Sequence, residues 1–418
     1  MRAWRIALSG LVLCSAVAAA SAETINATPE NLASILERVN PGDTVVCADG
    51  VYGGGFTIAR SGTEAAPIVL KAAGSGCVFE GGADCLRIEA ASYVTVEGIR
   101  FQHAERCGIF PAAPPAEPAT HVTIRRCVFA ENGFPGVMSG HINHLTIEDC
   151  EAYGGVRSHG LYVSNSGDYP VVRGNRIHNN VKCGLHMNGD PEMGGDGVIS
   201  FALVENNRIW ENGKPAGGSA INVTHVQDSI FRNNLAYNNY AGGIITYYDT
   251  GGDACASKRN KIVNNTVVFR PGEGKWALAL KRNSIGAFVQ NNVLVGGKYA
   301  AIGIEESSRE GLMMDYNVIA TYPGQQFGGD STEGTSVSEE EWRKLGYDAH
   351  SSIGRMPQFE NAEAGDFRLA AGSAGVDAGA DLKDLVLTDI DGNVRPRGEG
   401  FDCGCFERSS GEKSARRP

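Results

Sequence analysis

One short phrase recurs along the chain and limits the fold more than any other feature of the sequence. Its copies read VRGN, VENN and IVNN, among others, and successive copies are 23 to 32 residues apart. A period in the twenties with short strands around each turn is typical of a parallel β-solenoid, whereas β-propeller repeats are longer. The repeated position is occupied by Cys127, Cys150, Asn175, Asn207, Asn234, Asn265, Asn292 and Asn317.

Asparagine suits such a turn for two physical reasons. It tolerates the left-handed backbone of a tight bend, and stacked amide side chains hydrogen-bond to the coils above and below. At ~4.8 Å per coil, about ten coils would make a rod ~50 Å long. Residues 28–39 carry apolar side chains at helical spacing after a Thr-Pro start, which predicts an amphipathic helix over the open edge of the first coil.

The ends of the chain predict segments outside the solenoid. Arg2, Arg5 and a following apolar run that ends at Ala20-Ser21-Ala22 predict a secretory signal and a secreted or periplasmic protein. We therefore expect a signal peptide (1–22), a β-helix with its N-terminal cap (23–320), a loop, short helix and irregular cap over the far end of the rod (321–407) and a disordered tail (408–418).

Charge and hydropathy exclude several classes of partner. The formal net charge of −11 argues against a nucleic-acid-binding protein, which needs a basic surface. After the signal no stretch holds 18 consecutive apolar residues, so we expect no membrane insertion, and we expect a monomer. Cys127 and Cys150 share one column on adjacent coils, which allows either stacked thiols or a disulfide.

A second alignment brings polar residues together on one face. Alternation along the strands predicts two buried columns, which read Leu161, Leu185, Ile221, Ile244, Leu278, Ile302 and Val163, Met187, Val223, Thr246, Leu280, Ile304. The outward columns between them read Tyr162, His186, Asn222, Ile245, Ala279, Gly303 and Ser164, Asn188, Thr224, Tyr247, Lys281, Glu305. The longest coils carry their extra residues just past these strands, at 111–120, 190–200 and 249–258, so we expect a cleft walled by loops.

Two long passages resemble a known family. Pro41–Gly82 is similar to the opening of secreted bacterial right-handed parallel β-helix proteins of the pectate-lyase fold, in particular chondroitinase B-like and alginate lyase-like polysaccharide lyases. Gly365–Gly379 and Asp389–Glu407 resemble the ending of many such proteins. The resemblance implies an all-β right-handed parallel β-helix and activity on an acidic polysaccharide or oligosaccharide. It also implies a Lys base, an Arg and often Ca²⁺, although the surrounding motif is not matched here.

The polar face holds side chains suited to β-elimination on a uronic acid. That reaction needs a group that neutralises the carboxylate, a base, and an acid for the leaving oxygen. The candidate catalytic residues are His186 as base, Tyr162 as acid, His159 and His225 in either role, and Lys281 and Arg282 for the carboxylate. The candidate substrate-binding residues are Asn188, Asn222, Tyr247, Tyr248 and Asn165, and Asp190 and Asp249 are candidate Ca²⁺ ligands.

Other functions use the same face differently. Asp190 and Asp249 lie two coils apart in this alignment, roughly 10 Å, which also suits an inverting glycoside hydrolase. A uronate C5-epimerase of the same fold would share the proton-abstraction step, and a non-catalytic carbohydrate-binding rod would use the face only to bind. We favour elimination.

Overall fold

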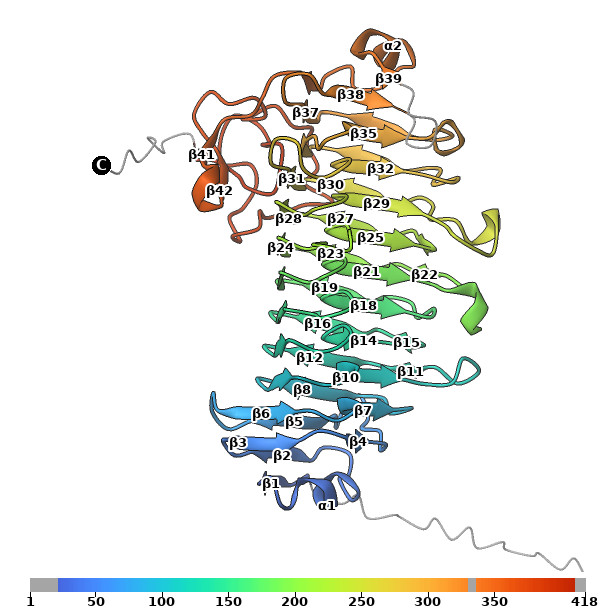
Figure 1. Cartoon of the computed structure of the whole chain (residues 1–418), viewed down its shortest axis with the longest axis vertical. Helices are drawn as coiled ribbons and strands as arrows, with labels where there is room; N and C mark the ends of the chain where they lie inside the picture. The colour runs from blue at the N-terminus through green and yellow to red at the C-terminus, as the bar shows by residue number, and fades with distance from the viewer. Residues whose placement is uncertain (1–21, 330–335, 410–418) are drawn as a thin grey trace, which may run out of the picture.

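The structure is a computed structural model that describes residues 22–329 and 336–409, and it shows a long rod of stacked coils (Figure 1). Successive coils contribute strands to three 12-stranded sheets, which we name A, B and C. Within these sheets the strands pair in parallel, except that the last strand of sheet C is antiparallel to its neighbour. The predicted parallel β-helix is confirmed, with slightly more coils than the sequence suggested.

The three sheets are built in a regular order along the chain. Sheet A contains β1 (Thr24–Ala27), β2 (Thr44–Cys47), β5 (Ile68–Ala72), β8 (Val94–Glu97), β12 (Val122–Arg125), β16 (Thr146–Glu148), β19 (Val171–Arg173), β23 (Leu203–Glu205), β27 (Ile230–Arg232), β30 (Lys261–Val263), β33 (Phe288–Gln290) and β36 (Met313–Asp315). Sheet B contains β3 (Gly50–Gly53), β6 (Cys77–Glu80), β9 (Arg100–Gln102), β13 (Val128–Ala130), β17 (Glu151–Tyr153), β20 (Arg176–His178), β24 (Arg208–Trp210), β28 (Leu235–Tyr237), β31 (Thr266–Val268), β34 (Val293–Val295), β37 (Val318–Ala320) and β40 (Ser352–Ile353). Sheet C contains β4 (Phe56–Ile58), β7 (Asp84–Glu89), β10 (Cys107–Ala112), β14 (Val137–Met138), β18 (Leu161–Ser164), β21 (Leu185–Asn188), β25 (Ile221–Thr224), β29 (Ile244–Tyr247), β32 (Leu278–Leu280), β35 (Ala300–Ile304), β38 (Gln326–Gly329) and β39 (Ser336–Val337).

Short strands and helices outside the three sheets lie in the loops, at the ends of the rod and in the C-terminal segment. Two pairs of short strands extend the loops beside sheet C, and a third pair lies in the C-terminal segment. They are β11 (Ala119–Thr120) with β15 (Ile142–Asn143), β22 (Ile199–Ser200) with β26 (Val226–Gln227), and β41 (Phe359–Asn361) with β42 (Asp366–Leu369). The single-turn helices are η1 (Pro191–Met193), η2 (Asp253–Cys255), η3 (Glu306–Ser308) and η4 (Ala362–Ala364), and the α-helices are α1 (Leu32–Leu36) and α2 (Glu339–Lys344).

The core of the rod follows the predicted alternation. Leu161, Leu185 and Ile221 pair in register, and each is 0% exposed. Because a strand turns successive side chains to opposite faces, the intervening residues must point out of the rod. Both inward columns and the first outward column of sheet C therefore stand as the sequence predicted. The second outward column does so as far as Tyr247, because Lys281 and Glu305 follow β32 and β35 rather than lie in them.

The asparagine column forms a continuous ladder in the turn between sheets A and B. The Nδ2 of Asn207 donates to the Oδ1 of Asn234 at 2.9 Å and to the carbonyl of Val172 at 2.9 Å, and its own Oδ1 accepts from Asn175. The same contacts recur on each coil up to Asn317. The ladder satisfies buried backbone groups that would otherwise lack partners.

Two cysteines continue the ladder toward the N-terminal end of the rod as stacked thiols. The Sγ of Cys150 accepts from the backbone N–H of Cys127 at 3.4 Å and contacts the carbonyl of Glu148 at 3.3 Å, in the manner of the asparagines above. The ten cysteines of the described residues are all free thiols, so the disulfide alternative is wrong.

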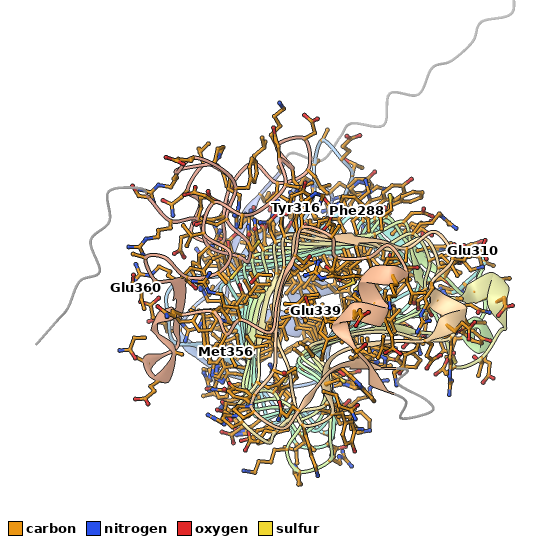
Figure 2. All side chains as sticks on the ribbon, turned by 90° about the horizontal axis from the view of Figure 1, so that it is seen from above. Phe288, Glu310, Tyr316, Glu339, Met356 and Glu360 are labelled. Atoms are coloured by element: carbon orange, nitrogen blue, oxygen red, sulfur yellow. The ribbon has the colours of Figure 1, made fainter. Side chains whose placement is uncertain are left out.

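Helices cover both ends of the rod. At the first coil α1 buries Leu32, Ile35 and Leu36, but it is shorter than predicted because residues 29–31 and 37–38 form turns rather than helix. At the far end α2, the short helix expected in this segment, begins with a capping box in which Ser338 and Glu341 exchange hydrogen bonds. Figure 2, which looks down the rod, shows Glu339 of α2 over the end of the coil stack.

The C-terminal segment lies on the flank of the rod rather than over its end, which corrects our expectation. Residues 355–408 run along the outer face of sheet B, as Glu360 in Figure 2 and β41 and β42 in Figure 1 show. Leu235, Val268 and Val295 face outward there and pack against Phe367, Leu369 and other residues in a second apolar core. Side chains of the ladder turns hold the segment: Asn233, Asn264 and Asn291 each donate Nδ2 to one of its backbone carbonyls.

Two predictions concern residues that are largely outside the described part of the chain. The signal peptide covers residues 1–22, of which 22 alone is described, and the tail covers 408–418, of which 408 and 409 are described. Among the helices that the structure describes, none is both long and apolar enough to cross a membrane.

Candidate functional site on sheet C

The polar patch predicted from the sequence forms on the outer face of four neighbouring strands, β18, β21, β25 and β29. Tyr162 pairs in register with His186, and His186 pairs with Asn222 on the next coil. One column further along, Asn188 pairs with Thr224 and Thr224 with Tyr247. Side chains 23 to 36 residues apart in sequence thus become neighbours at the coil spacing of ~4.8 Å.

Hydrogen bonds fix the protons of two histidines at the start of this patch. The backbone N–H of Cys183 donates to the Nδ1 of His159 at 3.1 Å, so that nitrogen carries a lone pair. The neutral ring of His159 must then carry its proton on Nε2, which lies 3.2 Å from the Nδ1 of His186. By the same logic His186 carries its proton on Nε2, and within the described residues this buried atom has no hydrogen-bond partner.

Burial keeps both rings neutral. Burial, together with the nearby His186 and the positive charge of Lys182, lowers the pKa of His159 to about 2. Burial also lowers the pKa of His186 to about 4, where Asp249 acts in the opposite direction. His186 therefore presents an N–H donor at neutral pH, and its only lone pair faces His159. This geometry corrects its predicted role as the base.

Two tyrosine hydroxyls converge on the patch from opposite sides. The ring of Tyr162 stacks on His186 with centroids 4.7 Å apart, and its hydroxyl lies 3.5 Å from the Nδ2 of Asn188, one coil on. The hydroxyl of Tyr247 accepts from the Nδ2 of Asn222 at 3.1 Å, one coil back. Both hydroxyls thus lie over the adjacent strands β21 and β25. Burial raises the pKa of Tyr162, so its phenol stays protonated at neutral pH.

His225 is fully buried and occupied at both ring nitrogens. Its Nδ1 lies 2.8 Å from the Oδ1 of Asn188, which also accepts from the backbone of Asp190. Its Nε2 lies 3.0 Å from the carbonyl of Thr250 and 3.3 Å from a carboxylate oxygen of Asp249. Because both ring nitrogens already face protein oxygen atoms, His225 positions Asn188 and the loop that begins at Asp249 rather than acting as acid or base.

The remaining predicted residues lie around the patch rather than in it. The ammonium of Lys281 sits 4.3 Å from the ring centre of Trp276, and the guanidinium of Arg282 donates to the carbonyl of Tyr248 at 3.0 Å. The hydroxyl of Tyr248 contacts Asp253 in its own loop at 3.2 Å. Asn165 follows β18 in a left-handed turn, with φ of 60°.

The three predicted loops project on one side of the rod, past the ends of the sheet C strands (Figure 1). The loop that carries η1 is tied to the coil below by the Ser166 hydroxyl, which accepts from the backbone of Gly197 at 3.0 Å. The loop that carries η2 is tied by His225 and by the Nε2 of Gln227, which donates to the carbonyls of Ala254 and Ala256. The outer face beside them is more covered than expected, since Asn222 is 9% exposed and Thr224 is 0% exposed.

The acidic residues of the patch do not make a protein-built calcium site. Ca²⁺ takes six to eight oxygen ligands in proteins. No group of three or more His, Cys, Asp or Glu suited to a metal occurs in residues 22–329 and 336–409. One oxygen of Asp249 is already engaged by the backbone of Thr250 and by His225. We therefore derive no step through a metal held by Asp190 and Asp249.

One cation of the site was missed in the sequence. Lys182 is exposed, and its charge acts on both His159 and His186. It makes no side-chain hydrogen bond or ion pair to another described residue. Its place could have been inferred from two similar phrases in the sequence, since Lys182 precedes Cys183-Gly-Leu as Ser158 precedes His159-Gly-Leu.

Comparison with known proteins agrees with this architecture. Residues 116–319 match the family model described as "Right handed beta helix region". No curated protein matches the chain. Among solved structures, pectate lyase Pel9A is 17% identical with a TM-score of 0.58, and the match covers 93% of this chain and 97% of that one. An alginate lyase from Paenibacillus sp. str. FPU-7 is 21% identical with a TM-score of 0.53, covering 74% of this chain and 98% of that one. The chain therefore has a right-handed parallel β-helix fold similar to that of these two lyases.

Proposed function

We propose that this protein is an exported polysaccharide lyase that cleaves a uronic-acid-containing glycan by β-elimination on the outer face of sheet C. The observation that carries the proposal is the convergence of the Tyr162 and Tyr247 hydroxyls, each beside an asparagine amide, over adjacent coils. The similarity in fold to a pectate lyase and an alginate lyase supports the same reaction class. The acidic polysaccharide is the proposed partner.

Elimination moves two protons and needs no water. A base takes the proton from C5 of the uronate, the electrons form the C4–C5 double bond, and the C4–oxygen bond breaks. The leaving oxygen then takes a proton from an acid. Tyr162 is the proposed acid because its raised pKa keeps the phenol protonated. Tyr247, whose oxygen accepts from Asn222, is the proposed base, and it takes the C5 proton as the phenolate, which becomes the neutral phenol. Lys182 is the proposed cation that offsets the charge of the carboxylate.

The experiment that tests the function is a screen on acidic polysaccharides with product analysis. The purified protein is incubated with pectate, polymannuronate and other polyuronides, and ultraviolet absorbance reports the unsaturated uronate that only elimination creates. We expect absorbance to rise with at least one substrate, and we expect Tyr162→Phe and Tyr247→Phe to lose about 100-fold or more of that rate, in line with typical general acid–base contributions. Tyr169→Phe is the control, since Tyr169 lies 46% exposed away from the patch.

Other outcomes of the same screen identify the alternatives. New reducing ends without the absorbance would indicate a hydrolase that uses Asp190 and Asp249, and inversion at C5 without cleavage would indicate an epimerase. Binding without any product would indicate a non-catalytic rod. A parallel series with a chelator tests Ca²⁺: the mechanism above predicts an unchanged rate, whereas loss of rate that added Ca²⁺ restores would require a metal.

A further inference from the structure

The histidine pair at the edge of the patch has a fixed direction. The backbone N–H of Cys183 donates to His159, and the Nε2–H of His159 donates to His186. Of the donors in this series of hydrogen bonds, the Nε2–H of His186 alone has no acceptor among the described residues. A buried donor without a partner is costly, of the order of 1–3 kcal/mol, and native proteins rarely keep one without a use. The unused donor is the Nε2–H of His186, between Tyr162 and Asn222 on the neighbouring coils.

We propose that the Nε2–H of His186 is a locked donor that binds a carboxylate oxygen of the substrate, and that His159 is the residue that locks it. The proposal rests on the proposed function, because it names the substrate group that this site recognises. A carboxylate is the group of a uronate that fits a buried N–H on a ring that the charge of a cation reaches, since hydrogen bonds to a charged acceptor are about twice as strong as neutral ones. Lys182 is that cation.

The lock matters because an unconstrained imidazole has two tautomers. With the proton on Nδ1, His186 would turn a lone pair towards the carboxylate and repel it. His159 prevents this tautomer, because its own Nε2–H occupies the Nδ1 of His186. His159 therefore acts through His186 and is a positioning residue. Among the described residues, the charges of Lys182 and Asp249 act on the pair, and the Tyr162 ring contacts both histidines.

Two substitutions of similar size separate the lock from simple packing. His159→Gln keeps the direction of the chain, because an amide oxygen can accept from Cys183 while the amide nitrogen donates to His186. His159→Glu reverses it, because a carboxylate accepts from both sides and draws the proton of His186 to Nδ1. The tautomer is read directly by long-range ¹H–¹⁵N correlation on protein with ¹⁵N-labelled histidine. We expect the Nε2–H form of His186 in the wild type and in His159→Gln, and the Nδ1–H form in His159→Glu.

The functional readout is binding in a background that does not cleave. In Tyr162→Phe/Tyr247→Phe protein, titration calorimetry with oligogalacturonate and oligomannuronate is compared with titration of their carboxyl-reduced, neutral forms. We expect His159→Glu to weaken binding of the acidic oligosaccharides about tenfold or more and His159→Gln to change it little. Neither substitution should change the affinity for the neutral, carboxyl-reduced oligosaccharides. A reversed tautomer with unchanged affinity for the acidic oligosaccharide would overturn the proposal.

The two proposals fail in different ways. If the tautomers and the binding behave as expected but no polyuronide is cleaved by the wild type, the carboxylate site stands and the lyase function falls. If the wild type eliminates but His159→Glu, added alone, leaves KM and kcat unchanged, the lyase function stands and the lock falls.

Discussion

A single asparagine on each coil carries a large share of the hydrogen bonding in the turn between sheets A and B. Asn234 is 0% exposed, and its amide makes contacts to the coil below, to the coil above and to the backbone. Replacing one such residue leaves several buried groups unsatisfied at once, and that costs more than the mean worth of the bonds themselves.

Asn234→Leu tests the ladder at this scale. It removes the acceptor of the Asn207 backbone N–H, 3.2 Å away, and the donor to the carbonyl of Val204, 2.9 Å away. We expect a loss of about 3 kcal/mol or more in the free energy of unfolding, measured by denaturant titration. Asn26→Leu is the control, because Asn26 is an exposed residue of β1 outside the ladder. Equal losses would contradict the special role of the column.

The histidine pair makes stability depend on pH with a definite sign. The folded rings stay neutral down to the lowered pKa values, about 4 for His186 and about 2 for His159, while the unfolded rings take up protons near 6.5. Between pH 6.5 and 4 the unfolded chain therefore binds more protons, so the free energy of unfolding falls as pH falls through this window. Denaturant titrations at pH 7, 6 and 5 should show a shallower fall in His159→Gln than in the wild type. The same slope in both would contradict a neutral, buried His159.

At the scale of elements, a ladder of alternating charge runs along the outer face of sheet A. Glu97, Arg125, Glu148, Arg173, Glu205 and Arg232 occupy one column on successive coils. Three carboxylate–guanidinium pairs within it measure 2.6 to 2.7 Å. Each exposed pair contributes little alone, but the alternation penalises any slip of one coil against another, because like charges would then meet.

Glu148→Lys against Glu148→Gln isolates the alternation. The first places three positive charges on successive coils, with Arg125 and Arg173 on either side, whereas the second only removes a charge. We expect Glu148→Gln to cost less than ~1 kcal/mol and Glu148→Lys to cost ~1 kcal/mol more, with the difference shrinking at high salt. A difference that persists in 1 M salt, where the Debye length is about 3 Å, would point to packing rather than charge.

Strand register was predictable from the sequence, but the chemistry of the patch was only partly so. The period-two alternation and the asparagine turns fix which residues share a column, so Tyr162, His186 and Asn222 could be placed together. The hydrogen bonds that fix the tautomers of His159 and His186 could not be predicted. His159 precedes β18, and the position of its ring depends on the backbone conformation there. For the same reason the sequence could not show that the two ring nitrogens of His225 contact Asn188 and Thr250.

At the scale of the whole molecule, the C-terminal segment makes a second core that the sequence indicated only indirectly. Strands β31 and β34 lack polar alternation, and each of their residues is buried. Continuous apolar strands are typical of sheets covered on both faces, so this part of sheet B needs a covering segment. The rod would otherwise expose an apolar patch of the kind that promotes association. The segment lies over sheet B, so it leaves the patch on sheet C free.

Arg395 is the residue that most firmly fastens this segment to the rod. Its guanidinium pairs with Glu407 at 2.6 Å, with both side chains 0% exposed, and donates to the Oδ1 of Asn233 on the rod at 3.1 Å. Burial raises the pKa of Glu407, and the adjacent Arg395 acts against that rise. Removal of one partner of a buried ion pair leaves the other charge uncompensated, at a cost of about 3–5 kcal/mol.

Arg395→Met should therefore loosen the C-terminal segment while leaving the sheet C patch intact. We expect the free energy of unfolding to fall by about 3–5 kcal/mol, and hydrogen exchange to increase in residues 355–408 and on β28, β31 and β34. Arg208→Met is the matched control: Arg208 also joins the rod to the segment, through Asp391 at 2.6 Å, but both side chains are more than a third exposed, so we expect a loss below ~1 kcal/mol. If the two variants lost equal stability, burial would not be what makes the Arg395 pair strong. If Arg395→Met also removed glycan binding at low temperature, the segment and the sheet C patch would be coupled, contrary to their placement on different faces of the rod.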